Sequence, residues 1–367
     1  MLSFGIMTMR MQGEKTYFYE IAKRAKHFGM ECFKFIPSQF NPVSQKVQGE
    51  RFNSQTDKWE SAEFLLPAIL YDRCFYGEDT HSSQCKAIVK WLRTREDLLF
   101  LGYGLPNKLD LYDALKSSRL SPYLLPSKPI TSGKGLIQHL NEDSPAVIKP
   151  LNGSQGRGIY YLEKTGKEVF VSTQKQGHLI EKTFPHYDKA ITWVNQLIKD
   201  KNYLVQPYKN LKNKKKKPFD IRVLLQKNEN GCWEEIAKGI RVGKKNGIIS
   251  NVNAGGTITS FEEGMNGLPA SEKEYIESEL QDILTSLPVI LEKEFPPLFE
   301  IGVDIGICKD QAIWILDINS KPGRKVALSI NPELSEKLYS APLLYGKTLA
   351  KERGFLNEKA LSSRNSS

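Results

Sequence analysis

The stretch FEIGVDIGICKDQAIWILDINSKPGR, residues 299–324, contains two apolar runs separated by a short polar segment. The runs 299–308 and 312–319 are each long enough for one strand, and the polar residues between them favour a turn. The sequence therefore predicts a β-hairpin with Asp310 and Gln311 as its two-residue turn.

This hairpin would bring two carboxylates together. With the turn at those residues, Asp304 lies directly opposite Asp317, and Asn319 points to the same side as Asp317 because side chains two apart share a strand face. Facing carboxylates repel each other, and burial increases the penalty, so a divalent cation would resolve the conflict. A set of two aspartates and one asparagine suits Mg²⁺ or Mn²⁺ better than zinc. The alternative is that both aspartates lie near strand ends, in water or bonded to backbone amides.

A glycine-rich loop lies earlier in the chain. Lys149 ends the predicted strand 145–151, and the loop NGSQGRG follows at 152–158 with three glycines. Glycines let backbone amides approach an anion closely, and the lysine adds a positive charge. The loop matches neither the Walker motif nor the G-x-G-x-x-G fingerprint. Taken alone, it is as compatible with an ordinary turn as with a phosphate-binding loop.

Two arginines interrupt apolar runs on neighbouring predicted strands. Arg222 lies in FDIRVLLQK and Arg241 in CWEEIAKGIRV, and Asn230-Gly231 between these runs is a strong hairpin signal. An arginine within a strand extends its charged end to solvent, pairs with a carboxylate, or binds phosphate. The pattern alone leaves these alternatives open.

The positive charge of the chain is concentrated in one place. The 367 residues include 52 Lys and Arg against 42 Asp and Glu, a formal net charge of +10. Residues 209–217, KNLKNKKKK, hold six lysines and no acidic residue, and without them the excess of +10 falls by six to +4. This run is either a solvated loop or a surface that faces a polyanion. Nucleic-acid binding as the main role is not expected, because no recognition motif accompanies the lysines.

Composition and spacing also exclude several classes of protein. No stretch approaches the ~18 uncharged apolar residues that a membrane span needs, and the amino terminus lacks the basic segment of a secretory signal. The five cysteines form no C-x-x-C pair, which predicts reduced thiols and a cytoplasmic location. The five histidines show no metal-ligand spacing, and no G-x-S-x-G turn is present. We therefore expect no zinc site and no serine nucleophile.

The sequence divides into three predicted folded units and a tail. Alternating strand and helix patterns over 1–105 predict a small α/β domain, which ends where glycines and a proline interrupt the chain. A second unit is predicted over 106–208 and a third over 209–355. The polar residues 356–367 predict a disordered tail.

Six short motifs, each weak alone, occur in an order that resembles the ATP-grasp superfamily. More narrowly, the chain resembles the YheC/YheD family of endospore-coat-associated ATP-grasp proteins. The motifs are VIKPLNGSQGRGI, YLVQPY, FDIRVLL, GVDIGI and WILDINSKPGR, together with ILYDRCF in the first unit. The resemblance implies an α/β (α+β) fold. Two α+β ATP-grasp subdomains, the first with the glycine-rich lid and the second with the metal site, follow a small Rossmann-like pre-ATP-grasp domain.

The resemblance also implies roles for particular residues. Contacts with ATP are implied for Lys108, Lys149, Gly153, Ser154, Gln155, Gly156, Arg157, Gly158, Gln206 and Tyr208, of which the glycine-rich residues form the lid and the last two the adenine hinge. Two Mg²⁺ or Mn²⁺ ions are implied at Asp304, Asp317 and Asn319. Arg222 and Arg241 are implied to face the transferred phosphoryl group. Substrate contacts are implied for Asn251, Asn253, Gly255, Gly256 and Arg324.

By the same resemblance, the expected activity is that of an ATP- and Mg²⁺-dependent ligase that joins a carboxylate to an amine through an acyl phosphate. The alternatives are an ATP-grasp kinase and an endospore coat or scaffold protein that binds ATP without turnover. The expected partners are small-molecule or peptide carboxylates and amines, with spore coat proteins as further candidates. Asp317 and Gln206 depart from the superfamily, which more often has glutamate at these two positions.

Overall fold

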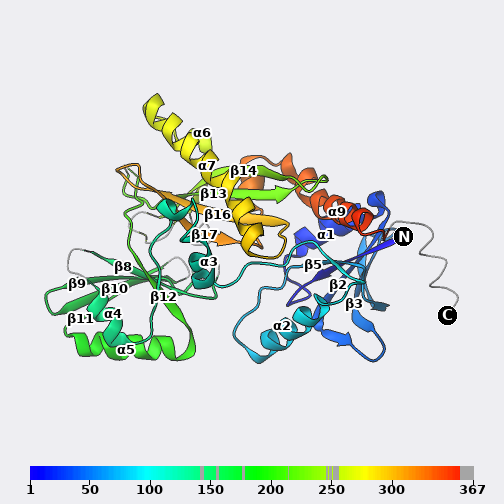
Figure 1. Cartoon of the computed structure of the whole chain (residues 1–367), viewed down its shortest axis with the longest axis horizontal. Coiled ribbons are helices and arrows are strands. Elements are labelled where there is room, and N and C mark those ends of the chain that lie inside the picture. Colours follow the sequence, from blue (N-terminus) through cyan, green and yellow to red (C-terminus); the bar gives the residue numbers. More distant parts are fainter. Residues whose placement is uncertain are drawn as a thin grey trace.

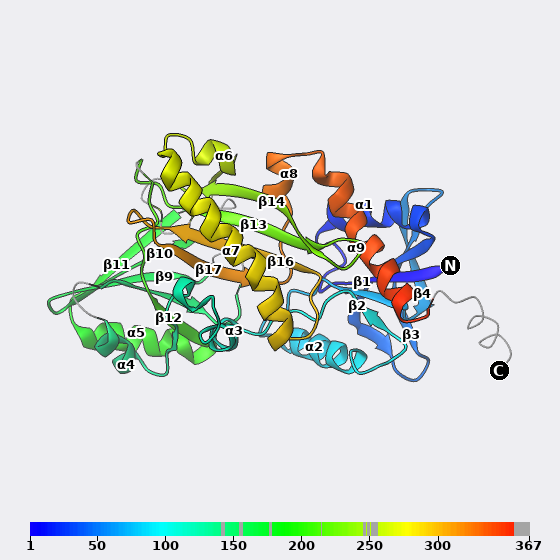
Figure 2. The same cartoon turned by 45° about the horizontal axis from the view of Figure 1, so that its top comes forward.

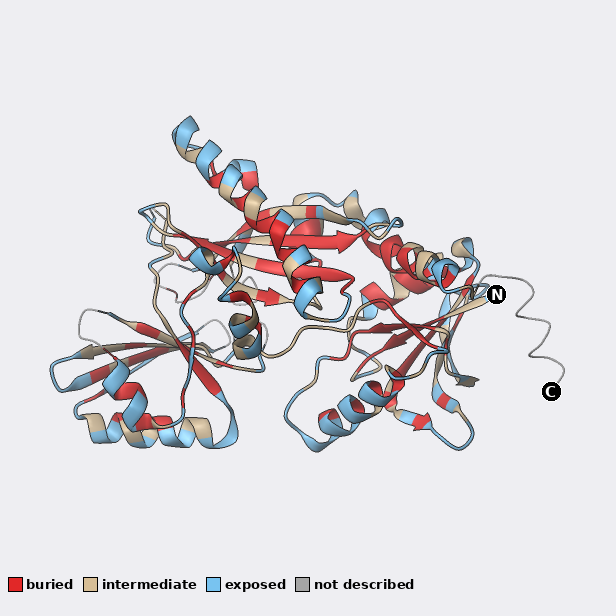
Figure 3. Cartoon of the chain, viewed as in Figure 1, coloured by how far each residue is buried: buried red, intermediate tan, exposed pale blue. Residues whose placement is uncertain are grey.

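The structure is a computed structural model that describes residues 1–140, 144–153, 157–175, 178–213, 215–244, 247, 250 and 256–355. The described strands form three separate sheets, two of six strands and one of five. The five-stranded sheet lies between the two six-stranded sheets, and the molecule is elongated (Figure 1). Buried residues concentrate on the strands of the three sheets and on the helix faces that cover them (Figure 3).

The first sheet is parallel at its centre because helices connect its strands. Its order is β4-β3-β2-β1-β5-β6, and β1 pairs in parallel with β2 and β5. The strands are β1 (Leu2–Met7), β2 (Met30–Asn41), β3 (Lys46–Asn53), β4 (Lys58–Leu65), β5 (Ile69–Asp72) and β6 (Leu99–Phe100). The helices are α1 (Lys15–Ala25), continued by the short η1 (Lys26–Phe28), and α2 (Thr80–Leu92).

The second sheet is antiparallel, and two helices cover one of its faces. Its order is β11-β10-β9-β8-β12-β7, and α4 packs with α5 on a core that includes Ile148, Val169 and Val194. The strands are β7 (Lys128–Pro129), β8 (Ala146–Pro150), β9 (Tyr160–Thr165), β10 (Glu168–Lys175), β11 (His178–Phe184) and β12 (Tyr203–Pro207). The helices are α4 (Gly133–His139) and α5 (Tyr187–Asp200).

The third sheet is also antiparallel, and the long α7 lies across it (Figure 2). Its order is β15-β14-β13-β16-β17. The strands are β13 (Phe219–Lys227), β14 (Trp233–Val242), β15 (Thr257–Ser260), β16 (Glu300–Ile307) and β17 (Ile313–Asn319). The other elements are α3 (Lys108–Leu115), η2 (Ser121–Tyr123), α6 (Phe261–Gly264), α7 (Ala270–Glu294), α8 (Lys325–Ile330) and α9 (Leu334–Glu352).

Two helices pack outside the segment that was predicted to contain them. Leu111 and Leu115 of α3 belong to the core of the third sheet, although the sequence assigned them to the second unit. Leu343 and Tyr345 of α9 pack on the first sheet, beside α1. The three sheets thus fall within 1–105, 106–208 and 209–355, but helices from two of these segments complete the cores of others. Residues 356–367 lie outside the described part of the chain.

The structure also bears on two expectations about class. All five cysteines are free. In the described ranges, none of the helices combines the length and the apolar character that crossing a membrane requires.

Candidate functional site

Basic and acidic side chains that the sequence analysis singled out converge where β8 and α3 face β17. Lys149 lies on β8, and its Nζ donates to the carbonyl oxygen of Leu316 on β17 at 3.4 Å. Lys108, the first residue of α3, forms an ion pair with Asp317. The helix begins at this lysine because the Asn107 side chain accepts hydrogen bonds from two backbone N–H groups of the first turn. Residues of the second and third predicted units thus meet in one site.

The hairpin of β16 and β17 confirms the predicted pairing of aspartates but not the predicted turn. Asp304 pairs with Asp317. The turn contains three residues, Lys309–Gln311, and Gln311 has a left-handed φ of 64°. The resulting one-residue offset is cancelled by a bulge after Asp304, which leaves Leu316 without a paired residue on β16. The carbonyl oxygen of this bulge residue is the acceptor for Lys149.

Asp304 lies between two arginines from adjacent strands. Its Oδ1 is 2.8 Å from Nη1 of Arg222, the residue opposite it on β13. Its Oδ2 is 2.8 Å from Nη2 of Arg241. Burial disfavours the charged form of Asp304, but the two guanidinium groups outweigh this effect and lower its pKa. Asp304 is therefore ionised at neutral pH, and the pKa of Arg241 is raised in return, against the effect of its own burial.

Asp220 holds Arg241 in place, and the sequence analysis missed it. Its two carboxylate oxygens accept hydrogen bonds from Nε and Nη2 of Arg241 at 2.7 and 2.6 Å, and the Ser250 hydroxyl donates to the same carboxylate. Burial raises the pKa of Asp220, while Arg241 counteracts this. The motif D-I-R carried the signal, because residues two apart share a strand face and Asp220 therefore points to the same side as Arg222.

The expected repulsion between two unpaired carboxylates is wrong, because both have cationic partners. Asp304 is neutralised by Arg222 and Arg241, and Asp317 by Lys108, so their pairing across the hairpin needs no metal ion for stability. A metal ion would instead have to compete with these cationic side chains for the carboxylate oxygens.

The residues present nevertheless fit a hard cation such as Mg²⁺. Oδ1 of Asp304 is buried and has no hydrogen-bond partner, because its contact with Arg222 lacks hydrogen-bond geometry. Asn319 donates from Nδ2 to Gly302 O at 3.3 Å, which leaves its Oδ1 as a further oxygen. A Cβ on Gly302 would lie 2.9 Å from that amide nitrogen, so only glycine leaves room for it. The described part of the chain has no group of three His, Cys, Asp or Glu side chains that could hold a metal. Further oxygen ligands would have to come from a bound molecule.

Lys149 has an ammonium group that its surroundings destabilise. Burial and the nearby Lys108 lower the pKa of Lys149 to about 8, although Asp317 and Asp304 act in the opposite direction. A further negative charge close to this amine would favour its protonated form.

Gln206 and Tyr208 lie where the chain leaves the second sheet for the third. Gln206 donates from Nε2 to Ser127 Oγ at 2.8 Å, while its Oε1 is buried without a hydrogen-bond partner. The backbone N–H of Tyr208 donates to Pro145 O at 2.8 Å, and its ring packs edge-on against Tyr161 with centroids 4.8 Å apart. The backbone N–H of Tyr208 therefore already donates a hydrogen bond within the protein, whereas Oε1 of Gln206 could still accept one.

The structure describes only part of the glycine-rich loop 152–158 and of the segment 251–256 that holds implied substrate contacts. Gly153, Arg157 and Gly158 flank a gap, and Gly158 has a φ of 73° that favours glycine. Gly256 lies directly before β15. The other predicted contacts in these segments lie outside the described residues, namely Ser154, Gln155, Gly156, Asn251, Asn253 and Gly255.

The structure contradicts the expected substrate contact of Arg324. This residue is only 6% exposed, and its Nη2 donates to the hydroxyl groups of Tyr17 and Tyr71 at 2.6 and 2.7 Å. The same nitrogen forms an ion pair with Glu300. A carboxylate of the protein itself thus occupies the guanidinium group that was expected to bind a substrate carboxylate.

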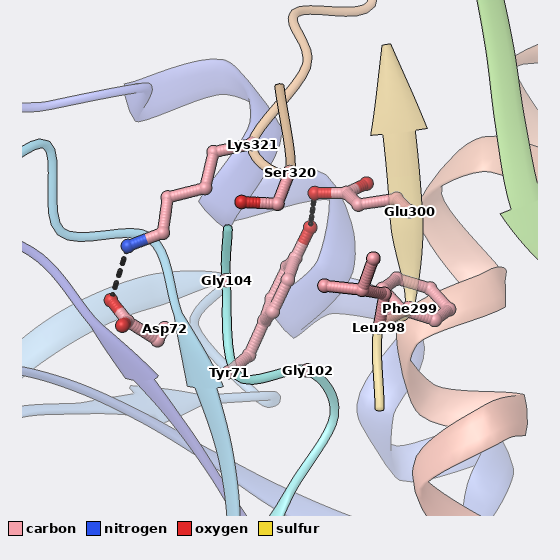
Figure 4. Close-up of a pocket in the computed structure, with 9 residues that line it drawn as sticks. All are labelled: Tyr71, Asp72, Gly102, Gly104, Leu298, Phe299, Glu300, Ser320 and Lys321. Carbon is pink, nitrogen blue, oxygen red and sulfur yellow. Dashed lines mark hydrogen bonds and ion pairs between the residues drawn. The ribbon is translucent and has the colours of Figure 1, made fainter. Parts of the chain in front are cut away.

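Arg73 completes this buried network, and the sequence analysis missed it although ILYDRCF contains it. Its Nη1 is 2.6 Å from Glu300, and Glu14 accepts from Nε and Nη2 at 2.8 and 2.6 Å. The neighbouring Asp72 accepts from Lys321 Nζ at 2.8 Å. Figure 4 shows this contact beside a small pocket between the first and third sheets, together with the 2.7 Å hydrogen bond from Tyr71 to Glu300.

Comparison with known proteins gives the family. The family model described as "YheC/D like ATP-grasp" matches residues 97–349. The endospore coat-associated protein YheC of Bacillus subtilis (strain 168) is 36% identical over 345 residues, which are 94% of each chain.

Solved structures share the fold at low sequence identity. N5-carboxyaminoimidazole synthetase from Staphylococcus aureus complexed with ADP has a TM-score of 0.52 and 12% identity, covering 94% of this chain and 76% of its own. D-alanyl-alanine synthetase A from Vibrio cholerae has a TM-score of 0.50 and 12% identity, covering 95% of this chain and 98% of its own. The fold is therefore the expected α/β ATP-grasp fold, and the chain belongs to the YheC/D-like ATP-grasp family.

Proposed function

We propose that this chain is an ATP- and Mg²⁺-dependent ligase that joins a carboxylate to an amine. One observation carries the proposal: Lys108, Lys149, Arg222 and Arg241 surround Asp304 and Asp317 between two sheets. Cationic side chains gathered around oxygen ligands for a metal are what phosphoryl transfer from ATP requires, because the transferred group carries negative charge.

The proposed reaction has two steps. The substrate carboxylate attacks the γ-phosphorus of ATP, the bond to the bridging oxygen breaks, and an acyl phosphate and ADP result. The amine then attacks the acyl carbon, phosphate leaves with the bonding electron pair, and the amine loses a proton to give the amide. Mg²⁺ bound at Asp304, Asp317 and Asn319 would neutralise phosphate charge.

Side chains of the protein would bind the phosphates, stabilise the transferred phosphoryl group and exclude water. Lys108 and Lys149 would exchange Asp317 and the Leu316 carbonyl for phosphate oxygens. Arg222 and Arg241, held at 2.8 Å from Asp304, would stabilise the transferred phosphoryl group. Gly153, Arg157 and Gly158 would belong to a lid that excludes water from the acyl phosphate, which water would otherwise hydrolyse.

The adenine base would bind at the hinge through a side chain. Oε1 of Gln206 is a buried acceptor without a partner, and the 6-amino group of adenine is a donor that would satisfy it. The backbone N–H of Tyr208, which donates to Pro145 O, is not free to serve the base.

The experiment that tests the ligase is a search for the product. The purified protein is incubated with ATP, Mg²⁺ and pools of carboxylates and amines, and ADP release and new amide masses are measured together. Ligase activity predicts ADP release that depends on both an acid and an amine. ADP release with an acid alone, and a stable phosphorylated product, would instead show an ATP-grasp kinase.

A scaffold that binds ATP without turnover is the second candidate function. The observation that favours it is that both aspartates already have cationic partners, so that a metal must displace ion pairs to bind. ATP binding without ADP release, under any combination of acids and amines, would support this candidate over the ligase.

We also propose an association with the spore coat, with synthesis in the cytoplasm. The name of the relative YheC supports this, since that protein is described as endospore coat-associated. Detection of the chain in purified coat fractions tests the association, and its absence from them would refute it.

A further inference from the structure

The described residues of the lysine run, 209–213 and 215–217, form the two sides of a hairpin beside the site. Lys212 and Pro218 form a β-bridge, and Asn213 N donates to Lys217 O at 2.9 Å. The Asn213 side chain accepts from the backbone N–H groups of Lys215 and Lys217 at 3.0 and 3.1 Å. The turn therefore fixes the backbone from which several like charges project.

The hairpin is attached to the third sheet at several points. Phe219 N donates to Leu211 O at 2.9 Å, and Gly243 N donates to Pro218 O at 2.8 Å. A Cβ on Gly306 would lie 2.7 Å from the Leu211 side chain, which shows how closely the hairpin packs on β16. These contacts bring Lys244 next to the hairpin. We call the resulting set the lysine cluster: Lys209, Lys212, Lys215, Lys216, Lys217 and Lys244.

Among the described residues, the lysine cluster has no carboxylate paired with it, and none of its six lysines forms an ion pair there. Nζ of Lys209 lies 4.1 Å from the centroid of the Trp314 ring. This contact is with an aromatic ring and not with a carboxylate. Holding like charges together without paired carboxylates costs free energy, which an anionic partner would offset.

We propose that the lysine cluster is a docking surface for a polypeptide segment rich in Asp and Glu. This goes beyond the proposed ligase activity and does not depend on it. The cluster lies near the site, because Lys217 precedes Arg222 by only five residues, at most roughly 17 Å at ~3.3 Å per residue. A docked acidic segment would therefore reach the entrance of the site.

The chemistry of the cluster favours an acidic polypeptide over a nucleic acid. Its described members are all lysines, whereas recognition of phosphate groups by two parallel hydrogen bonds relies on arginine. Single-stranded nucleic acids also need exposed aromatic faces on which bases stack. Trp314 and Tyr208, which lie beside the cluster, do not offer them, because Lys209 covers Trp314 and Tyr208 packs against Tyr161.

The test compares two variants that lose the same charge. The hairpin variant is Lys215→Gln, Lys216→Gln and Lys217→Gln. The control variant is Lys189→Gln, Lys199→Gln and Lys201→Gln, which changes three exposed lysines on and after α5. Binding of fluorescein-labelled octaglutamate is measured by anisotropy at low and at physiological salt, with an eight-nucleotide thymidine strand as a second probe. ATP affinity and melting temperature are measured for each protein.

The expected result is specific to the hairpin variant. Its dissociation constant for octaglutamate rises about tenfold, equivalent to about 1.4 kcal/mol, and the salt dependence of binding decreases. The control variant stays within about twofold of the wild type, and ATP affinity and melting temperature remain unchanged in both. Equal weakening in both variants, tighter binding of the thymidine strand, or no binding of octaglutamate by the wild type would overturn the proposal. Absence of ATP binding in the wild type would contradict only the proposed ligase.

Discussion

Lys149 should take up a proton when ATP binds, and this uptake tests whether the lysine contacts phosphate. In the free protein the pKa of Lys149 is about 8, against an ordinary value of 10.5, chiefly because the ammonium is buried. A phosphate group beside the amine would stabilise the ammonium and return its pKa towards the ordinary value. Binding of ATP above neutral pH should therefore draw a proton from the buffer.

The size of the uptake follows from the lowered pKa. With a pKa of about 8, the neutral fraction of Lys149 is about 0.1 at pH 7, about 0.5 at pH 8 and about 0.9 at pH 9. If binding protonates all of it, the uptake per ATP rises through these same values.

In the free protein the lowered pKa means that the folded state binds fewer protons than the unfolded state between about pH 8 and 10.5. The contribution of Lys149 to stability therefore increases as pH rises through that range.

Calorimetry in buffers of different ionisation enthalpy measures this uptake directly. Metal-free ATP is titrated into the wild type, into Lys149→Met and, as a control, into Lys128→Met, an exposed lysine on β7 of the same sheet. We expect the control to follow the wild-type curve, and Lys149→Met to take up almost no proton and to bind ATP about tenfold more weakly. A wild-type uptake below about 0.2 at pH 9, or the same curve in Lys149→Met, would refute the proposed phosphate contact.

The remaining predictions concern charge and selectivity. Asp304→Asn leaves Arg222 and Arg241 without the Asp304 carboxylate and should lower the free energy of unfolding by about 2 kcal/mol. Asp317→Asn, at a more exposed pair, should cost less than about 1 kcal/mol. Denaturant titration checks this order, and a more stable Asp304→Asn would contradict it. Gln206→Leu should weaken ATP binding severalfold without changing GTP binding, and an equal loss for both nucleotides in calorimetry would exclude an adenine contact. Arg73→Met leaves the buried Glu300 and the partly exposed Glu14 short of a partner and should cost about 3–5 kcal/mol. A denaturation midpoint equal to that of the wild type would show that the buried network contributes little.

The predicted pairing of Asp304 with Asp317 is confirmed, but the turn from which it was derived is wrong. The pairing of Asp304 with Asp317 was derived from a two-residue turn at Asp310 and Gln311. The turn has three residues, and a bulge at Leu316 restores the register between the aspartates. A bulge cannot be derived from apolar alternation, because it depends on contacts with another element, here the hydrogen bond from Lys149.

The charges around the site could be located from the sequence, but their partners could not. Arg222 and Arg241 interrupt apolar strands, and that pattern left pairing with a carboxylate and binding of phosphate equally open. The structure pairs both with Asp304, because the cross-strand register places Arg222 opposite it and Arg241 one strand further. Arg324 was misassigned for the same reason: its partner Glu300 is 24 residues away in the sequence, and only the fold brings them together.

The family model begins at residue 97, yet residues at the end of β5 in the first unit contact both ends of the β16–β17 hairpin. Glu300 at the start of β16 is bound by Arg73 at 2.6 Å, and Lys321 after β17 is bound by Asp72 at 2.8 Å. Glu300 shares a strand face with Asp304, four residues later, since side chains alternate along a strand. The side chain of Arg73 has no exposed surface, and that of Glu300 is 2% exposed, so separating the two sheets would leave buried charges unpaired. The first unit therefore acts on the geometry of the site through the hairpin, even though its residues do not belong to the group of charges around Asp304.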